Sequence, residues 1–315
     1  MTTIQTHPTT LDVILQQGQS VESLIGETPL VRLRNTGLTS RSNVQLLLKP
    51  EWGNPGGSVK DRIAYQIILD AKKSGALTKE TRLLDATSGN TGIGYAMVGA
   101  MLGYRVTLVM PSSVSKERIQ ILNAYGAELY LTDEQEGLDG AIRFAQDLAD
   151  KHPHKYYYAD QYGNDSNWKA HFRTTGPEIW RQTNGSVTHF VAGLGTSGTM
   201  MGVGRYLLQM KRSVQLVAIQ PDAPTHGIKG LKHMESSMVP GIYDETLIDD
   251  HISVTTDEAY RVVKDLARYE GLFVGISSGA AVAGALRLAR SLDDGVVVTM
   301  LPDAGYKYLS TGLWE

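Results

Sequence analysis

The chain has 315 residues, of which 33 are glycine and none is cysteine, with 30 basic and 33 acidic side chains. The lack of cysteine excludes disulfides, thiolate metal sites and a cysteine nucleophile. A net charge of −3 argues against a nucleic-acid groove or a polybasic membrane surface. The first 17 residues have no basic start and no apolar run. We therefore expect no signal peptide, a cytoplasmic protein, and contact with neither nucleic acid nor membrane.

Short apolar runs rich in Val, Ile and Leu alternate with helical patterns along the chain. The runs show little polar alternation, which is typical of strands buried on both faces. Alternating strands and helices predict an α/β protein with a mainly parallel sheet. In chain order the predicted strands are 44–48, 83–86, 106–110, 128–131, 187–192, 216–220 and 296–301. The predicted helices are 63–74, 92–102, 116–125, 141–151, 257–269 and 280–291, and the polar segment 156–167 is the predicted crossover between two domains.

The first motif is NPGGSVKDR, residues 54–62. Pro-Gly-Gly predicts a turn, and Ser58 with Asp61 has the spacing of a capping box. Ser115 similarly precedes Lys116-Glu117 at the start of the helix predicted from 116. Lys60 then falls in the first helical turn, where the helix dipole lowers the pKa of its amine. A lysine that forms a covalent imine needs such a lowered pKa. The alternative is an exposed lysine that pairs with Asp61 or a later carboxylate.

Three further Gly/Ser/Thr loops follow predicted strands and begin helices: DATSGNTG (85–92), GLGTSGT (193–199) and GISSGA (275–280). Backbone N–H groups and small hydroxyls at a helix start can hold a carboxylate or a phosphate. The second loop also satisfies G-x-G-x-x-G, and Asp222 follows it at about the distance of a ribose-binding acid. A dinucleotide site and a monophosphate site therefore both remain open for that loop. For the other two loops, an ordinary strand-to-helix turn and a helix cap are the alternatives.

Other chemistries lack support. The sequence has no H-E-x-x-H motif and no Walker A motif, and Ser277 and Ser278 lack the G-x-S-x-G context of a hydrolase. His171, His189, His226 and His233 are scattered, so we expect surface or core residues rather than ligands, and no metal site.

The motifs PGGSVKDR, TSGNTG, TTGPEIW, GLGTSGT, GISSGAAVAGAL and YLSTG occur together and in the order found in one group of enzymes. The chain resembles the pyridoxal-phosphate enzymes of the tryptophan-synthase-β fold type, and specifically the cysteine synthase family, over residues 25–312. TSGNTG, DQY at 160–162 and VPGIY at 239–243 are most similar to the cysteine synthase B branch. The resemblance favours pyridoxal phosphate over the nicotinamide interpretation of GLGTSG.

The resemblance implies a fold type II enzyme with two domains, each a mainly parallel twisted sheet flanked by helices. The expected smaller, mobile domain is 50–160, the larger phosphate-binding domain is 20–49 with 161–315, and 1–19 is an N-terminal extension. The cofactor is expected to contact Lys60, Asn90, Gly195, Thr196, Ser197, Gly198, Thr199 and Ser277. The substrate carboxylate is expected to contact Thr87, Ser88, Gly89, Thr91 and Gln161.

The implied roles follow from those positions. Lys60 holds the cofactor covalently and then abstracts the Cα proton of the substrate. Asn90 bonds the cofactor ring hydroxyl, residues 195–199 hold the phosphate, and Ser277 meets the pyridine nitrogen. A hydroxyl cannot protonate that nitrogen as a carboxylate would, which favours β-elimination.

The implied reaction is β-replacement on O-acetyl-L-serine, with sulfide or another sulfur donor, to give L-cysteine in a homodimeric transferase. Lys232 is the candidate cation for accepting O-phospho-L-serine as well. Two alternatives remain: a cystathionine β-synthase-type reaction with homocysteine, and a nicotinamide-dependent oxidoreductase that uses GLGTSG.

Overall fold

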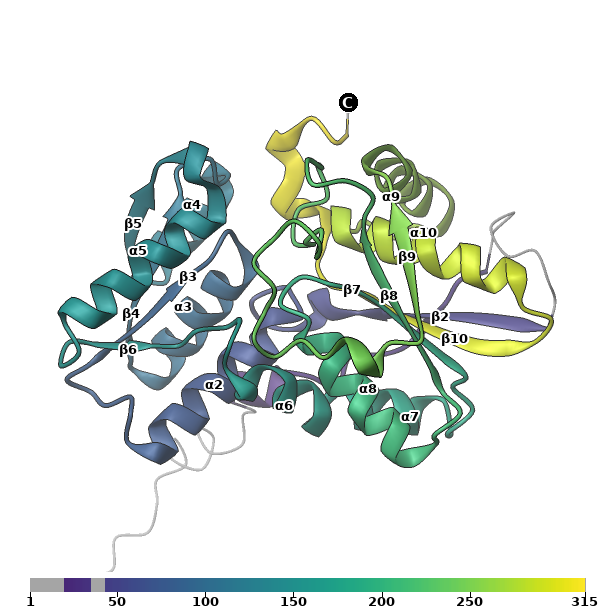
Figure 1. Cartoon of the computed structure of the whole chain (residues 1–315), viewed down its shortest axis with the longest axis horizontal. Helices are drawn as coiled ribbons and strands as arrows, with labels where there is room; N and C mark the ends of the chain where they lie inside the picture. The colour runs from purple at the N-terminus through teal and green to yellow at the C-terminus, as the bar shows by residue number, and fades with distance from the viewer. Residues whose placement is uncertain (1–19, 35–42, 315) are drawn as a thin grey trace, which may run out of the picture.

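The computed structural model describes residues 20–34 and 43–314, which form two separate sheets (Figure 1). One sheet has six strands in the order β1-β2-β10-β7-β8-β9, and the other has four in the order β5-β4-β3-β6. All neighbouring strands are parallel except β1, which is antiparallel to β2. The predicted α/β class with two mainly parallel sheets flanked by helices is therefore confirmed.

The strands are β1 (Val31–Arg32), β2 (Val44–Pro50), β3 (Arg82–Ala86), β4 (Arg105–Pro111), β5 (Glu128–Thr132), β6 (Tyr156–Tyr158), β7 (His189–Gly193), β8 (Gln215–Pro221), β9 (Asp250–Val254) and β10 (Gly295–Leu301). The α-helices are α2 (Lys60–Ser74), α3 (Asn90–Leu102), α4 (Lys116–Ala124), α5 (Gly137–Lys151), α6 (Asp165–Arg173), α7 (Thr175–Gln182), α8 (Gly198–Met210), α9 (Thr256–Glu270) and α10 (Ile276–Ser291). Short 3-10 segments are η1 (Val21–Leu24), η2 (Glu51–Gly53), η3 (Glu134–Glu136), η4 (Glu245–Leu247) and η5 (Gly305–Thr311).

Helices cover both faces of each sheet. Apolar side chains of α2 and α3 pack on one face of the four-stranded sheet, and those of α5 pack on the other. In the six-stranded sheet, α9 and α10 cover one face while α7 and α8 cover the opposite face (Figure 1). Burial on both faces explains why the strand sequences are nearly continuous apolar runs.

Several helices begin earlier than the apolar pattern predicts. The start of α10 is Ile276 rather than 280, α5 starts at Gly137 rather than 141, and α2 starts at Lys60 rather than 63. These first turns consist largely of polar residues and glycine, which an apolar periodicity passes over. The pattern also misses β1, β6, β9, α6 and α7, because these elements are short or polar. It misses most of α8 as well, whose first half contains Gly198, Gly202 and Gly204.

The two predicted serine caps are wrong in detail. The N-cap of α2 is Val59, and Ser58 Oγ instead accepts from the Lys60 N–H at 3.3 Å. Ser115 does occupy the N-cap of α4, but its side chain makes no capping hydrogen bond. Sequence spacing placed both serines at helix starts, whereas the rotamer is decided by tertiary contacts.

The order of the sheets along the chain places β3 to β6 in the four-stranded sheet, between β2 and β7 of the six-stranded sheet. The domain boundaries at 50 and 160 and the crossover at 156–167 stay predictions, and the expected extension 1–19 lies outside the described residues. Within the described residues, no helix is long and apolar enough to cross a membrane.

Candidate active site

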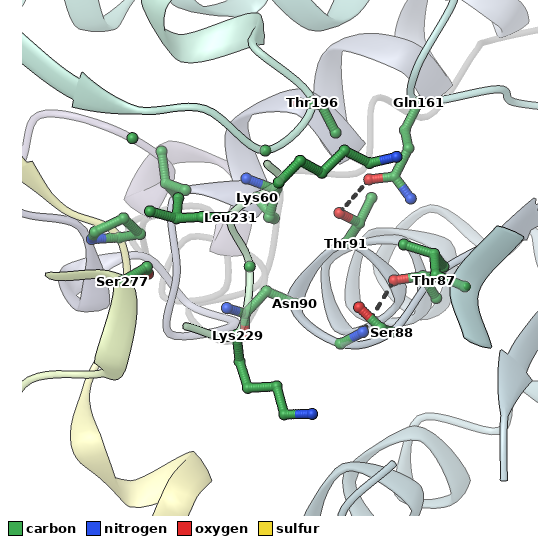
Figure 2. Close-up of a pocket in the computed structure, with 18 of the residues that line it drawn as sticks. Lys60, Thr87, Ser88, Asn90, Thr91, Gln161, Thr196, Lys229, Leu231 and Ser277 are labelled. Carbon is green, nitrogen blue, oxygen red and sulfur yellow. Dashed lines mark hydrogen bonds between the residues drawn. The ribbon is translucent and has the colours of Figure 1, made fainter. Parts of the chain in front are cut away.

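One cavity of about 350 Å³ gathers every residue that the sequence assigned to cofactor or substrate. Its walls come from the carboxyl ends of strands in both sheets and from the first turns of the helices that follow (Figure 2). Ligands of α/β proteins bind at this edge of the sheet, because loops and helix N-termini converge there. The predicted residues in the lining are Lys60, Thr87, Ser88, Gly89, Asn90, Thr91, Gln161, Gly195, Thr196, Ser197, Gly198, Thr199, Lys232 and Ser277.

Lys60 is the first residue of α2 and is half-buried. Burial lowers the pKa of its amine, and the nearby carboxylates of Asp303 and Glu51 partly offset that effect. The dominant cause is therefore burial rather than the helix field proposed from sequence. Asp61 does not pair with Lys60 in the described residues: its Oδ2 accepts from the Gly56 N–H at 2.6 Å and closes the turn. Lys60 is therefore neither fully exposed nor paired with Asp61.

A buried charge network anchors the start of α2. The Arg62 guanidinium contacts Glu51 at 2.6 Å and Glu178 at 2.6 Å, and Lys49 contacts Glu178 at 2.8 Å. These four side chains are almost fully buried and come from β2, η2, α2 and α7. Removing one partner would leave an uncompensated buried charge, so the network holds Lys60's helix against the six-stranded sheet.

Residues 87–91, named the substrate loop here for the role that the sequence predicts, are held by hydrogen bonds within the loop and to Gln161. Thr87 Oγ1 accepts from the N–H groups of Gly89 at 3.1 Å and Gly92 at 3.2 Å. Thr91 Oγ1 donates to Gln161 Oε1 at 2.7 Å, and Gln161 Nε2 donates to Ala86 O at 2.7 Å. Ser88 is exposed. The loop therefore presents the Ser88 hydroxyl and the N-terminus of α3, while its other polar side chains already have partners.

Asn90 is held from both sides by residues that sequence reasoning missed. Its Nδ2 donates to Asp303 Oδ2 at 2.7 Å, and its Oδ1 accepts from Lys307 Nζ at 2.9 Å. Tyr308 donates to the same Asp303 oxygen at 2.8 Å. Lys307 directly precedes the YLSTG motif, and Tyr308 is the first residue of that motif, to which the sequence assigned no role. The signal was present in the sequence, but its contact with Asn90 is a long-range one.

A second missed residue is Arg118 in α4. It lines the cavity with 8% of its surface exposed, and its guanidinium lies 5.2 Å from the ring centroid of Tyr308. Nothing in the KERIQ sequence distinguishes it from a surface arginine on an amphipathic helix.

Residues 195–199, named the phosphate loop here for the role that the sequence predicts, lead from β7 into α8. Ser197 has a left-handed backbone with φ of 66°, and its buried Oγ has no partner. A Cβ added at Gly195 would lie 2.4 Å from the carbonyl oxygen of Gly230. A helix N-terminus, small hydroxyls and an unsatisfied buried hydroxyl together fit a phosphate group.

The nicotinamide alternative lacks the acidic residue that it requires at the cavity. Asp222 is exposed in the bend after β8 and is not part of the cavity lining. A dinucleotide site would require that carboxylate to face the ribose. Ser277, in contrast, lies in the first turn of α10 with 6% of its surface exposed and lines the same cavity as Lys60 (Figure 2).

Lys232 is less exposed than a solvated loop lysine. Its side chain is 11% exposed, its Nζ lies 4.0 Å from Asp139 Oδ1 and 4.8 Å from the Tyr162 ring centroid, and it donates to Met238 O at 3.2 Å. Burial lowers the pKa of its amine, while Asp139 opposes that effect. The lysine therefore spans from the loop after β8 to α5 on the other side of the cavity.

Comparisons with known proteins agree with this geometry. The family described as pyridoxal-phosphate dependent enzyme matches residues 21–303. Cysteine synthase from Aquifex aeolicus (strain VF5) is 52% identical over 302 residues, covering 94% of this chain and 92% of the relative. Cysteine synthase B from Escherichia coli (strain K12) is 43% identical over 295 residues, covering 94% and 96%. The crystal structure of cysteine synthase from Entamoeba histolytica has a TM-score of 0.89 at 34% identity, covering 100% of this chain and 94% of that chain.

The resemblance to the cysteine synthases, cysteine synthase B among them, is thereby confirmed over nearly the whole chain. The cavity with its half-buried lysine and its phosphate loop is the expected cofactor site of such a protein. The chain belongs to the family of pyridoxal-phosphate dependent enzymes, within which the cysteine synthases are its relatives.

Proposed function

We propose that this chain is a cysteine synthase that replaces the acetoxy group of O-acetyl-L-serine with the sulfur of sulfide, releasing acetate and L-cysteine. The observation that carries the proposal is the convergence of Lys60, the substrate loop, the phosphate loop and Ser277 on one cavity. The residues there fall into three groups, one suited to the carboxylate of the substrate, one to the ring of the cofactor and one to its phosphate.

Pyridoxal phosphate, when bound, supplies an electron sink that stabilises negative charge at the substrate Cα. Residues 195–199 would hold its phosphate, Asn90 its ring hydroxyl and Ser277 its pyridine nitrogen. Lys60 would hold it covalently. The clamp of Asp303 and Lys307 fixes which atom of the Asn90 amide donates, because the ammonium can only donate to Oδ1.

The chain's own groups carry the proton and orient the substrate. Burial lowers the pKa of the Lys60 amine, which favours the neutral form that would take the Cα proton. Ser88, Gly89 and the N-terminus of α3 would bind the substrate carboxylate. Thr91 and Gln161, bonded to each other at 2.7 Å, would open that bond to join them. Thr87 would contribute through the loop shape that its hydroxyl holds.

Two finer features rest on the resemblance alone. We expect a homodimer in the cytoplasm, and O-phospho-L-serine as a second accepted substrate through Lys232. Light scattering on the purified protein measures the oligomeric state, and Lys232→Ala tests the second substrate.

The deciding experiment supplies the purified protein with O-acetyl-L-serine and either sulfide or homocysteine, and quantifies cysteine and cystathionine. We expect cysteine to form with a clearly higher kcat/KM. Faster cystathionine formation would contradict the proposal and support the reaction with homocysteine. A protein that lacks visible absorbance and binds a nicotinamide nucleotide would instead support the oxidoreductase alternative.

A further inference from the structure

Two buried polar side chains of α6 reach the phosphate loop from behind. Asn167 and His171 stand four residues apart, so they share one face of the helix. They are 0% and 1% exposed. Asn167 Nδ2 donates to Thr196 Oγ1 at 3.1 Å, and His171 Nε2 lies 3.2 Å from Thr199 Oγ1. Each of the two threonines of the phosphate loop thus has one partner on α6.

Glycines of α8 allow this approach. A Cβ added at Gly198 would lie 1.9 Å from Asn167 Oδ1, and one at Gly202 would lie 2.1 Å from the carbonyl oxygen of Trp168 and 2.6 Å from His171 Cβ. Gly198 and Gly202 are also four residues apart. The glycine face of α8 therefore lies directly against the Asn167–His171 face of α6.

The direction of the Asn167 bond is settled by its second partner. Nδ2 also donates to the carbonyl oxygen of Gln161 at 2.6 Å, and a carbonyl can only accept. The amide is therefore oriented with its NH2 group toward Thr196. Because the Thr196 oxygen accepts from Asn167, the hydroxyl proton of Thr196 is left to bond another acceptor, on the cavity side that Thr196 lines.

The direction of the His171 bond depends on which ring nitrogen carries the proton. Burial, with the positive charges of Arg62 and Lys60, holds the pKa of His171 well below its usual range, so the ring is neutral and carries one proton. Nδ1 lies 2.9 Å from the buried Thr175 hydroxyl. When the Thr175 hydroxyl donates to Nδ1, the ring proton is on Nε2, which then donates to Thr199; this is the tautomer that a donor role for His171 requires.

We propose that α6 is a positioning element for the cofactor phosphate: Asn167 and His171 each donate to one threonine, so that both hydroxyl protons point at the phosphate oxygens. A phosphate dianion only accepts hydrogen bonds, so hydroxyls locked as donors bind it and hydroxyls free to rotate bind it less well. The inference rests on the proposed cofactor site and adds two residues behind it (Figure 2 shows Thr196 at the cavity wall).

The first test uses Asn167→Asp, which keeps the shape but replaces the donating NH2 group by an accepting oxygen. Thr196 would then donate to the carboxylate and turn away from the phosphate. We expect the dissociation constant of the cofactor-depleted full chain for pyridoxal phosphate to rise about tenfold to a hundredfold. The dissociation constant for pyridoxal, which lacks the phosphate, should change less than about twofold.

The matched control is the same substitution in a Thr196→Val background. Without the Thr196 hydroxyl, Asn167→Asp should weaken pyridoxal phosphate binding by a much smaller factor. Equal factors in both backgrounds, or equal weakening of pyridoxal, would assign Asn167 a merely structural role and overturn the proposal. If the parent itself binds pyridoxal as tightly as pyridoxal phosphate, the phosphate site of the proposed function fails instead.

The second half is tested at His171. His171→Gln can place an amide NH2 near the position of Nε2 and should retain pyridoxal phosphate within a fewfold of the parent. His171→Leu removes the donor and should lose about tenfold or more. The thermal midpoint of each cofactor-depleted variant confirms folding, and similar losses in both variants would contradict the donor role.

Discussion

The substrate loop and the phosphate loop have nearly the same composition, and each connects a parallel strand to the helix that follows it, one in each sheet. They differ in hydrogen bonding. In the substrate loop, Thr87 and Thr91 already bond to backbone or to Gln161. In the phosphate loop, Ser197 has a left-handed backbone and a buried hydroxyl without a partner. A buried unsatisfied hydroxyl costs about 1–3 kcal/mol.

The difference indicates how each loop meets its ligand. The substrate loop is satisfied by itself, so binding exchanges existing bonds for new ones and the loop can adjust. The phosphate loop is complete only with an acceptor present, and α6 and α8 hold it rigidly through close helix contact. One loop is suited to a ligand that enters and leaves, and the other to a group that stays bound.

The largest expected effect is at Lys60, which in the proposed function would act on both the cofactor and the substrate. Lys60→Ala should lower kcat for cysteine formation by at least about a hundredfold, the usual contribution of a general base. It should also abolish the visible absorbance of the covalently held cofactor. Lys60→Arg serves as the control, because arginine stays protonated and cannot form the linkage. Near-parental kcat in Lys60→Ala would contradict the assignment.

A next test compares one glycine from each loop. Gly198→Val places side-chain atoms where Asn167 Oδ1 already lies, 1.9 Å from the Cβ position, and should lose pyridoxal phosphate on dialysis. The protein atoms nearest to that Cβ position are those of Asn167 in α6. A Cβ at Gly89 would lie 2.9 Å from Nε of Arg118, a side chain that would have to shift, so Gly89→Ala should retain the cofactor and raise KM for O-acetyl-L-serine. Equal cofactor loss in both variants would contradict the contrast between the loops.

We expect the Ser197 side chain to favour cofactor binding and to lower the unfolding free energy of the cofactor-depleted protein. Ser197→Gly removes both the left-handed strain of a non-glycine residue and the unpartnered hydroxyl. We expect the unfolding free energy of the cofactor-depleted protein to rise by about 1 kcal/mol in urea denaturation. Ser88→Gly, at the exposed serine of the substrate loop, should give no such rise. A destabilised Ser197→Gly protein would show that the hydroxyl has a structural partner.

The smallest effect is expected at Lys232. Its ammonium sits between Asp139 and Tyr162 at the cavity, so a phosphate must compete with contacts already made. Lys232→Ala should lower kcat/KM for O-phospho-L-serine severalfold and leave that for O-acetyl-L-serine nearly unchanged. An equal change for both substrates, or a parent without activity on O-phospho-L-serine, would rule out the contact.

The sequence by itself determined the fold class and the Gly, Ser and Thr loops that form one part of the cavity lining. Apolar runs of strand length, separated by helical patterns, are local signals that survive in any α/β context. The Gly, Ser and Thr clusters were visible because each lies next to its strand and helix along the chain. The covalent lysine candidate could be found from a nine-residue motif, and its family from the order of six motifs.

Only the tertiary structure decided which groups stand behind those motifs. Asp303 contacts Asn90 across 213 positions of sequence, and Asn167 contacts Thr196 across 29. The lowered pKa of Lys60 comes mainly from burial, which depends on how the two sheets enclose the cavity. The same holds for His171, which looked like one of several scattered histidines and lies against the phosphate loop. Hydrogen-bond partners and burial depend on which distant segments are packed together, and no local pattern of residues encodes that.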